Sequence, residues 1–205
     1  MEKNSLGRSL QQIGLSVGTD KVTSHNYAPC YEEHFGPLRS REIVLVEIGV
    51  YQGASIRMWE EYFPKAKIYG VDIAPSCLAY ATPRSRIVIG SQEDPAFLKK
   101  LGETTGPIDI LIDDGGHTMN QQRTSFQHLF PRIRPGGLYI IEDLETSYRP
   151  AFGGGHVGLQ GTTIRMLKNM IDAINNKYHE GSLVVAPAKI ESLRFYDNIC
   201  FIRRG

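Results

Sequence analysis

Residues 43–53 read IVLVEIGVYQG, and this stretch decides the fold. Its first part, Ile43–Ile48, is a short run rich in β-branched residues, as is typical of a strand buried on both faces. Gly49 and Gly53 follow, and the next residues, Ala54–Phe63 (ASIRMWEEYF), have the pattern of a helix. A buried strand that turns into a helix through glycines predicts the first βα unit of a parallel sheet.

The same alternation continues along the chain and predicts one sheet with helices packed on it. Four more parallel strands, two more helices and a C-terminal hairpin are expected. The strands are Lys67–Asp72, Arg86–Ile89, Ile108–Asp113 and Leu138–Ile141, and the helices are Pro95–Leu101 (with Asp94 as N-cap) and Asn120–Phe130, closed by a Pro131–Gly137 breaker cluster.

The last part of the chain predicts a different arrangement. Thr162–Tyr178 has apolar residues at helical spacing, and residues 150–161 are rich in glycine and are expected to form a mobile loop. Leu193–Tyr196 and Ile199–Arg203 are separated by two residues, which favours a hairpin. The predicted fold class is therefore α/β, a Rossmann-like doubly wound, mostly parallel sheet with a C-terminal antiparallel hairpin.

Length and composition favour one domain and exclude several classes of function. We expect residues 1–40, which have no clear strand, to form an N-terminal cap on a domain of residues 41–205. The net charge is +1, with 23 Lys and Arg against 22 Asp and Glu, which argues against a protein that coats nucleic acid. Three scattered cysteines, the absence of an apolar leader and the absence of a membrane-spanning stretch favour a soluble, cytoplasmic protein.

Polar residues at the ends of the first two strands predict a nucleotide pocket. Gly49 and Gly53 permit a tight turn and a close approach of the backbone to a ligand. Asp72, nineteen residues after Gly53, ends the second strand, where an acid can accept hydrogen bonds from both ribose hydroxyls. Glycines serve steric needs alone in many α/β turns, which is the structural alternative. The G-x-G-x-x-G pattern of dinucleotide sites is missing, which disfavours an NAD-linked oxidoreductase.

Four carboxylates and a histidine follow the fourth and fifth strands. Asp113-Asp114-Gly-Gly-His117 closes one strand, and Glu142-Asp143 closes the other. Parallel strands bring their carboxyl ends to one crevice, where clustered carboxylates repel one another unless they share a cation. Oxygen ligands suit Mg²⁺, and His117 is a natural general base. The alternatives are acids that cap helices or face solvent, and a His117 that only supports a ligand.

The pattern E-x-G-x-x-x-G with an acid after the second strand resembles the S-adenosylmethionine (SAM) site of class I methyltransferases, and Pro135-Gly136-Gly137 resembles the turn before their fifth strand. The resemblance implies that the Gly loop faces the methionine part, that Asp72 holds the ribose, and that residues after the third strand contact adenine. The cofactor-binding residues implied in this way are Glu47, Gly49, Tyr51, Gly53, Asp72, Ser91 and Gln92.

D-D-G-G-H followed by E-D resembles the metal-dependent sugar O-methyltransferases of the mycinamicin type and related rhamnosyl and mannoside O-methyltransferases. That resemblance implies Mg²⁺ on Asp114, Glu142 and Asp143, His117 as the base, and Asp113 directed toward the cofactor. Gly18-Thr-Asp-Lys21, His25-Asn-Tyr27 and Tyr31 resemble the segment that closes the SAM pocket in this group, and add Thr19, Lys21 and Tyr27 to the expected cofactor residues.

The predicted function is Mg²⁺-dependent transfer of a methyl group from SAM to a sugar hydroxyl, with Asp114 and His117 as the catalytic residues. The group's enzymes are longer than this chain, so we expect a saccharide or small glycoside as acceptor. We expect a homo-oligomer and no nucleic-acid or membrane partner. A catechol or other phenol is the alternative acceptor, and a non-catalytic SAM-binding module is a less favoured alternative.

Overall fold

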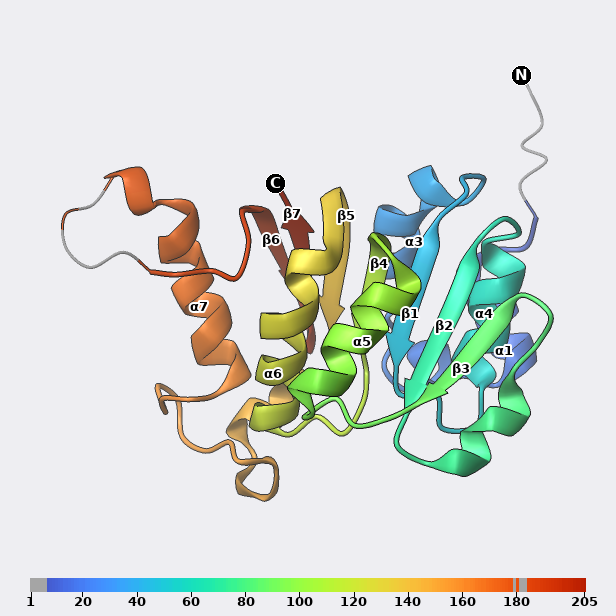
Figure 1. The fold of residues 1–205 in the computed structure, drawn as a ribbon, viewed down its shortest axis with the longest axis horizontal. Coiled ribbons are helices and arrows are strands. Elements are labelled where there is room, and N and C mark those ends of the chain that lie inside the picture. The colour runs from blue at the N-terminus through green and yellow to red at the C-terminus, as the bar shows by residue number, and fades with distance from the viewer. Residues whose placement is uncertain (1–6, 179, 181–183) are drawn as a thin grey trace.

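Seven strands form one sheet in the order β3-β2-β1-β4-β5-β7-β6 (Figure 1). The computed structural model describes residues 7–178, 180 and 184–205. Strands β1 to β5 run parallel, β7 runs antiparallel to β5, and β6 runs antiparallel to β7. The strands are β1 (Val44–Ile48), β2 (Lys67–Asp72), β3 (Ser85–Ile89), β4 (Ile108–Asp113), β5 (Ile133–Ile141), β6 (Ile190–Tyr196) and β7 (Ile199–Arg204).

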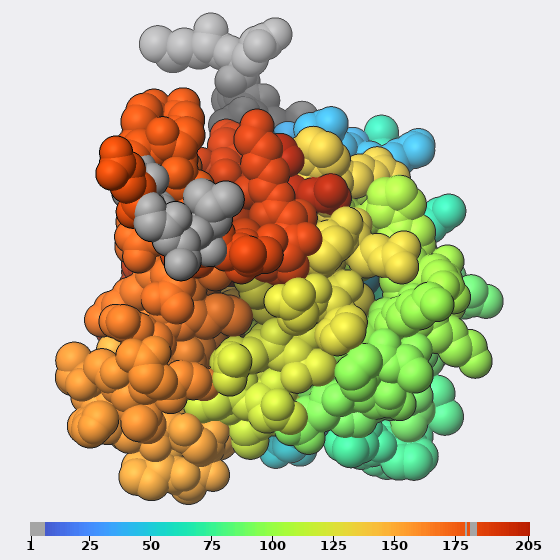
Figure 2. Space-filling view, turned by 60° about the vertical axis from the view of Figure 1, so that its left-hand side comes forward, coloured from blue at the N-terminus to red at the C-terminus, as the bar shows by residue number. Residues whose placement is uncertain are grey.

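Helices cover both faces of the sheet because the strands present apolar side chains to both sides. In β4, Ile110 and Ile112 pack into one hydrophobic cluster and Leu111 packs into the other. One face carries α1 (Leu10–Val17), α3 (Ala28–Phe35) and α4 (Ala54–Tyr62), and the other carries α5 (Pro95–Thr105), α6 (Met119–Leu129) and α7 (Thr163–Ile174). Figure 2 shows the second face, where α5 (green), α6 (yellow) and α7 (orange) lie side by side.

The fold class predicted from the sequence is confirmed: β2 and β4 have the predicted bounds, and most other element ends lie within one residue of the predicted ones. The hairpin turn falls at the two predicted residues, between β6 and β7, and Asp94 caps α5 by accepting a hydrogen bond from Ala96 N. The predicted C-terminal helix is shorter: α7 ends at Ile174, and a separate 3-10 turn, η6 (Asn176–Tyr178), follows it.

One sequence prediction about the sheet is wrong. The Pro131–Gly137 cluster was expected to break the chain before a strand at 138, whereas β5 already starts at Ile133. The pairing with β4 shifts register between Ile108 and Ile110, and Gly136 adopts a positive φ of 80°. This irregularity accommodates the Pro-Gly-Gly residues without ending the strand.

Between Leu10 and Phe35 the chain forms helices that pack on the sheet, which is one of the two forms, helical or irregular, expected for the N-terminal cap. Ser9 and Gln12 form a capping box at the start of α1, and α2 (Asp20–Thr23) follows Gly18, which ends α1 in the left-handed conformation. Helices α1 and α3 share a hydrophobic cluster with α4. The division into a cap of residues 1–40 and a domain of residues 41–205 stays a prediction. Within the described residues, no helix is long and apolar enough to cross a membrane.

Candidate functional site

The ends of β1 and β4 touch, and a glycine makes this contact possible. Gly49 has φ +97°, and a Cβ atom built on it would lie 2.0 Å from the backbone oxygen of Asp114. The backbone N–H of Asp114 in turn donates to the carbonyl of Ile48 at 2.9 Å. The sequence suggested that Gly49 permits a ligand to approach, and the structure shows that it also permits the two loops to meet.

Replacing Gly49 with alanine is expected to lower the free energy of unfolding by about 3–5 kcal/mol, from the left-handed conformation and the overlap together. Gly18→Ala is the matched control, because Gly18 also has positive φ (74°) but no heavy atom within 4 Å of a built Cβ. Thermal or urea unfolding of both variants measures the difference. Equal losses would show that the contact with Asp114 is unimportant.

A cavity of about 510 Å³ opens beside this contact, along the ends of β1, β2 and β4. Its size is in the range of small-molecule sites. Five predicted cofactor residues line it, and so does Asp114. These residues are Gly49, Tyr51, Asp72, Ser91 and Gln92; the predicted Glu47, Gly53, Asp113, Thr19, Lys21 and Tyr27 are not among its lining residues.

Asp72 fixes the loop that follows β1 and keeps capacity for a ligand. Its Oδ2 accepts the backbone N–H groups of Val50 (2.9 Å) and Tyr51 (3.1 Å), and its Oδ1 accepts that of Ala74 (2.9 Å). Burial raises the pKa of Asp72, but these three donors outweigh it and bring the pKa below its usual value. A carboxylate has about four acceptor positions, so Asp72 can accept a further hydroxyl.

Asp113 is buried and does not line the cavity, but it contacts Gln92, which does. The Asp113 side chain has no exposed surface, and it accepts hydrogen bonds from Gln92 Nε2 (2.9 Å) and the Tyr139 hydroxyl (3.1 Å). Gln92 Oε1 accepts the backbone N–H of Gly116 at 3.0 Å. Burial raises the pKa of Asp113. The Asp113 carboxylate is thus engaged within the protein, while Gln92 links the loop after β4 to the cavity wall.

Three of the predicted side chains converge next to the cavity. One ligand atom each from Asp114, His117 and Asp143 lies within 4.8 Å of the others, which is suitable for a metal ion. His117 Nε2 lies 3.4 Å from Asp143 Oδ2, and the three side chains are 17–22% exposed. His117 Nδ1 is buried without a hydrogen-bond partner among the described residues. Burial raises the pKa of Asp143 above its usual value.

The backbone at two of these residues is left-handed. His117 has φ +57° and Asp143 has φ +55°. Non-glycine residues rarely adopt this conformation, and it is enriched where side chains must be directed into a site. The glycines Gly115 and Gly116 precede His117 and fit against Gln92 and Gln121, where a Cβ would overlap. The chain therefore bends back after β4 and returns His117 to the strand ends.

Glu142, the third predicted metal ligand, lies deeper than the other two acids. Its Oε1 accepts from Lys21 Nζ at 2.7 Å and from the Tyr31 hydroxyl. Burial and the nearby charge of Asp114 raise the pKa of Glu142 well above its usual value. Lys21 was expected to bind the cofactor. In the structure it contacts Asp114 and Glu142 and does not line the cavity.

Three residues that contact Asp143 were not predicted to do so: Tyr27, His25 and Asn198. The Tyr27 hydroxyl donates to Asp143 Oδ1 at 3.1 Å, and Asn198 Nδ2 lies 3.3 Å from the same oxygen. His25 Nδ1 is 3.5 Å from it. Tyr27 was expected at the cofactor, and His25 was quoted only as part of a motif. No sequence motif marked the turn between β6 and β7 as functional. Asn198 comes close to Asp143 only because the C-terminal hairpin packs beside β5.

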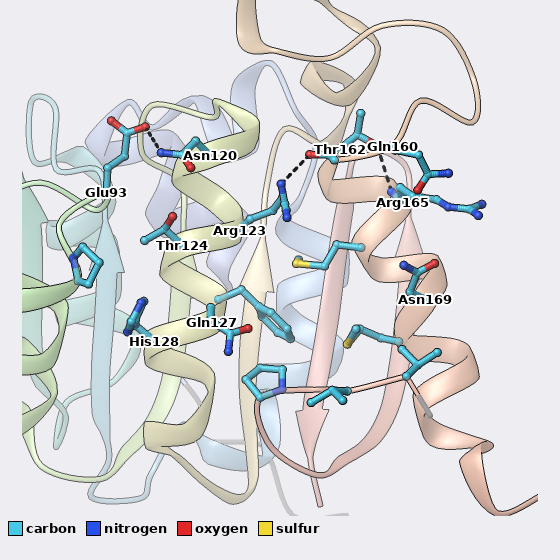
Figure 3. A pocket seen from close by; sticks show the side chains of 18 residues that line it. Glu93, Asn120, Arg123, Thr124, Gln127, His128, Gln160, Thr162, Arg165 and Asn169 are labelled. Atoms are coloured by element: carbon cyan, nitrogen blue, oxygen red, sulfur yellow. Dashed lines mark hydrogen bonds between the residues drawn. The ribbon is translucent and has the colours of Figure 1, made fainter. Parts of the chain in front are cut away.

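A second hollow, of about 610 Å³, lies between α6 and α7 (Figure 3). Its rim carries Arg123, which donates to the Gly161 carbonyl, and polar residues such as His128 and Asn169. Buried Phe126 and Met170 also line it. None of the residues that the sequence assigned to the cofactor, the metal or the reaction lines this hollow. The cavity at the strand ends, which several of them line, is therefore the better candidate for the functional site.

The central part of the chain is similar to a known family of protein domains. Residues 46–144, which include the ends of β1, β2 and β4, match the model of a methyltransferase domain. The chain is 41% identical over 207 residues to 8-demethyl-8-alpha-L-rhamnosyl tetracenomycin-C 2'-O-methyltransferase of Streptomyces olivaceus, covering 95% of this chain and 54% of the relative. It is 38% identical over 194 residues to mycinamicin VI 2''-O-methyltransferase of Micromonospora griseorubida, covering 88% of this chain and 48% of the relative.

Among solved structures, the fold is similar to that of the MycE methyltransferase from the mycinamycin biosynthetic pathway in complex with Mg, SAH and mycinamycin VI. The TM-score is 0.91 at 38% sequence identity, and the match covers 97% of this chain and 54% of that chain. This chain therefore spans about half the length of the relatives it matches.

Proposed function

This chain carries a methyltransferase domain with the class I fold, and from that premise we propose that it transfers a methyl group from S-adenosylmethionine to a hydroxyl of a sugar or small glycoside, with Mg²⁺ or a similar cation. One observation carries the proposal. Asp114 lines the cavity of predicted cofactor residues and also belongs to the Asp114–His117–Asp143 cluster. A methyl donor in the cavity and an acceptor at the cluster would therefore be neighbours.

The donor set fits a hard divalent cation. Asp114 and Asp143 supply carboxylate oxygens to the cluster, whereas Glu142 lies outside it and shares Lys21 Nζ with Asp114. Asp114 and Asp143 would hold the ion, with Glu142 as the third predicted ligand. Bound there, the cation would hold an acceptor hydroxyl and lower its pKa. The similarity to O-methyltransferases of rhamnosyl tetracenomycin-C and mycinamicin VI supports a saccharide acceptor.

His117 would take the proton of the acceptor. Its Nε2 faces Asp143 Oδ2 at 3.4 Å, so the imidazolium formed would lie beside a carboxylate. This contact stabilises the charged ring and keeps it directed into the cluster. The loops after β1 and β4 position donor and acceptor on the two sides of Asp114, and this positioning supplies a large part of the rate.

Residues on the cavity wall would bind the cofactor. Asp72, fixed by three backbone donors, would accept a ribose hydroxyl, and Ser91 and Gln92 lie where the adenine is expected. Gly49 and Tyr51 form the adjoining wall. The homo-oligomer and the cytoplasmic location stay predictions, for which sedimentation and cell fractionation are the measurements.

Asp72→Ala is expected to raise the dissociation constant for SAM roughly 100-fold, because a charged hydrogen bond and the anchor of residues 50–51 are both lost. Isothermal titration calorimetry without acceptor or metal measures this. Asp94→Ala is the control, since Asp94 follows the neighbouring strand β3, does not line the cavity and caps α5. Wild-type affinity in Asp72→Ala would remove Asp72 from the proposed cofactor site.

A further inference from the structure

A lysine lies buried among the acids of the site. The Lys21 side chain is 1% exposed, and its Nζ lies 2.5 Å from Asp114 Oδ2, 2.7 Å from Glu142 Oε1 and 3.4 Å from Glu47 Oε1. Glu47 and Glu142 are themselves 0% and 2% exposed. Such a group of buried carboxylates is unstable without a positive charge among them.

Lys21 places a positive charge next to the proposed metal centre. It holds one oxygen of Asp114, whose side chain also belongs to the Asp114–His117–Asp143 cluster. It comes from α2, while the Tyr31 hydroxyl, which donates to the same Glu142 oxygen, comes from α3. The N-terminal segment therefore contacts Asp114 and Glu142 through Lys21 and Tyr31, and it also contacts Asp143 through Tyr27.

We propose that Lys21 is a built-in counter-cation, a positioning residue that holds Asp114 and Glu142 in place in the metal-free protein. The chain then folds with its acidic site assembled, and the divalent ion is needed for the reaction and not for folding. This inference rests on the proposed function because it concerns the same metal centre. Its test uses stability and metal binding, and needs neither SAM nor an acceptor.

Lys21→Met removes the charge and keeps a side chain of similar shape. In EDTA, we expect its melting temperature to fall by roughly 10 °C, because the buried Glu47 and Glu142 and the partly exposed Asp114 lose their cation. Adding Mg²⁺ should restore at least about half of this loss, since the ion would compensate two of these carboxylates, Asp114 and Glu142. The wild-type protein should gain less than half as much as the variant on addition of Mg²⁺. Equal gains would overturn the proposal.

Two further variants separate charge from packing. Tyr31→Phe removes a neutral donor from Glu142, so it should lower the melting temperature without increasing the gain from Mg²⁺. Lys21→Met with Glu142→Gln removes one charge of each sign and should recover stability in EDTA. This double variant also decides the case in which Lys21→Met alone does not fold. Failure of the double variant to fold, or a gain from Mg²⁺ as large as that of the single variant, would refute the counter-cation role.

Binding of Mn²⁺ to the wild-type protein, followed by electron paramagnetic resonance, distinguishes the two levels of the account. If Mn²⁺ binds and Lys21→Met gains no more stability from Mg²⁺ than the wild type, the inference about Lys21 fails and the proposed function stands. If the wild-type protein binds no Mn²⁺, the metal-dependent function fails, and the inference fails with it.

Discussion

His117→Asn is expected to lower kcat for methyl transfer by about 10²–10⁴-fold, the usual contribution of a general base, and to leave the dissociation constant for SAM within about twofold. His117 is not among the residues that line the cofactor cavity, but its Nε2 lies in the cluster beside Asp143. Asparagine is the suitable replacement because the backbone at His117 is left-handed, and asparagine tolerates that conformation better than alanine does.

The control for this variant is His128→Gln. His128 lies on α6 and lines the second hollow, away from the proposed reaction. We expect wild-type kcat from it. A loss of SAM binding in His117→Asn equal to its loss of kcat would show that His117 is structural. Unchanged kcat would remove it from the reaction altogether.

Asp143→Asn should weaken binding of the divalent cation by about 100-fold or more, because one of the two carboxylates that would hold the ion becomes neutral. The fold should be retained. Asn can occupy the left-handed backbone position, and its side chain can still accept the hydrogen bond from Tyr27. Metal binding can be measured with Mn²⁺, and activity as a function of Mg²⁺ concentration should shift to the same extent.

Glu145→Gln is the matched control, since it removes a carboxylate two residues away that pairs with Arg149 instead of joining the cluster. Its affinity for the cation should change by less than about threefold. If the two variants lost affinity equally, the effect would come from the general negative charge of this surface. Wild-type affinity in Asp143→Asn would place the ion elsewhere.

The strands could be predicted from the sequence where the local hydrophobic pattern agrees with the burial of the strand in the folded protein. The run at 43–48 and the acid-ended strands at 67–72 and 108–113 are buried on both faces, so their apolar residues are continuous and easily recognised. The start of β5 was missed because Pro135 and its following glycines have the composition of a turn. A register shift against β4 accommodates them. Because a register shift depends on how two strands pair, the sequence of β5 alone does not reveal it.

The proximity of the acids at the strand ends was predictable from the sequence, and their individual contacts were not. Acids at the ends of parallel strands must meet, so the approach of Asp114 to Asp143 followed from topology. Nothing in the local sequence shows that Lys21 is buried, since lysines are usually exposed and its partners lie 26 to 121 residues away. The same holds for Asn198, whose place at Asp143 depends on the C-terminal hairpin.

Metal-dependent methylation of a sugar can be measured as transfer of labelled methyl from SAM to a panel of monosaccharides, oligosaccharides, glycosides and catechols, each with and without EDTA. We expect labelling of a saccharide or glycoside that is lost in EDTA and restored by Mg²⁺. Labelling of catechols alone would keep the fold and the metal and replace the acceptor. Saccharide labelling that is indifferent to EDTA would contradict the role of the Asp114–His117–Asp143 cluster as a metal centre.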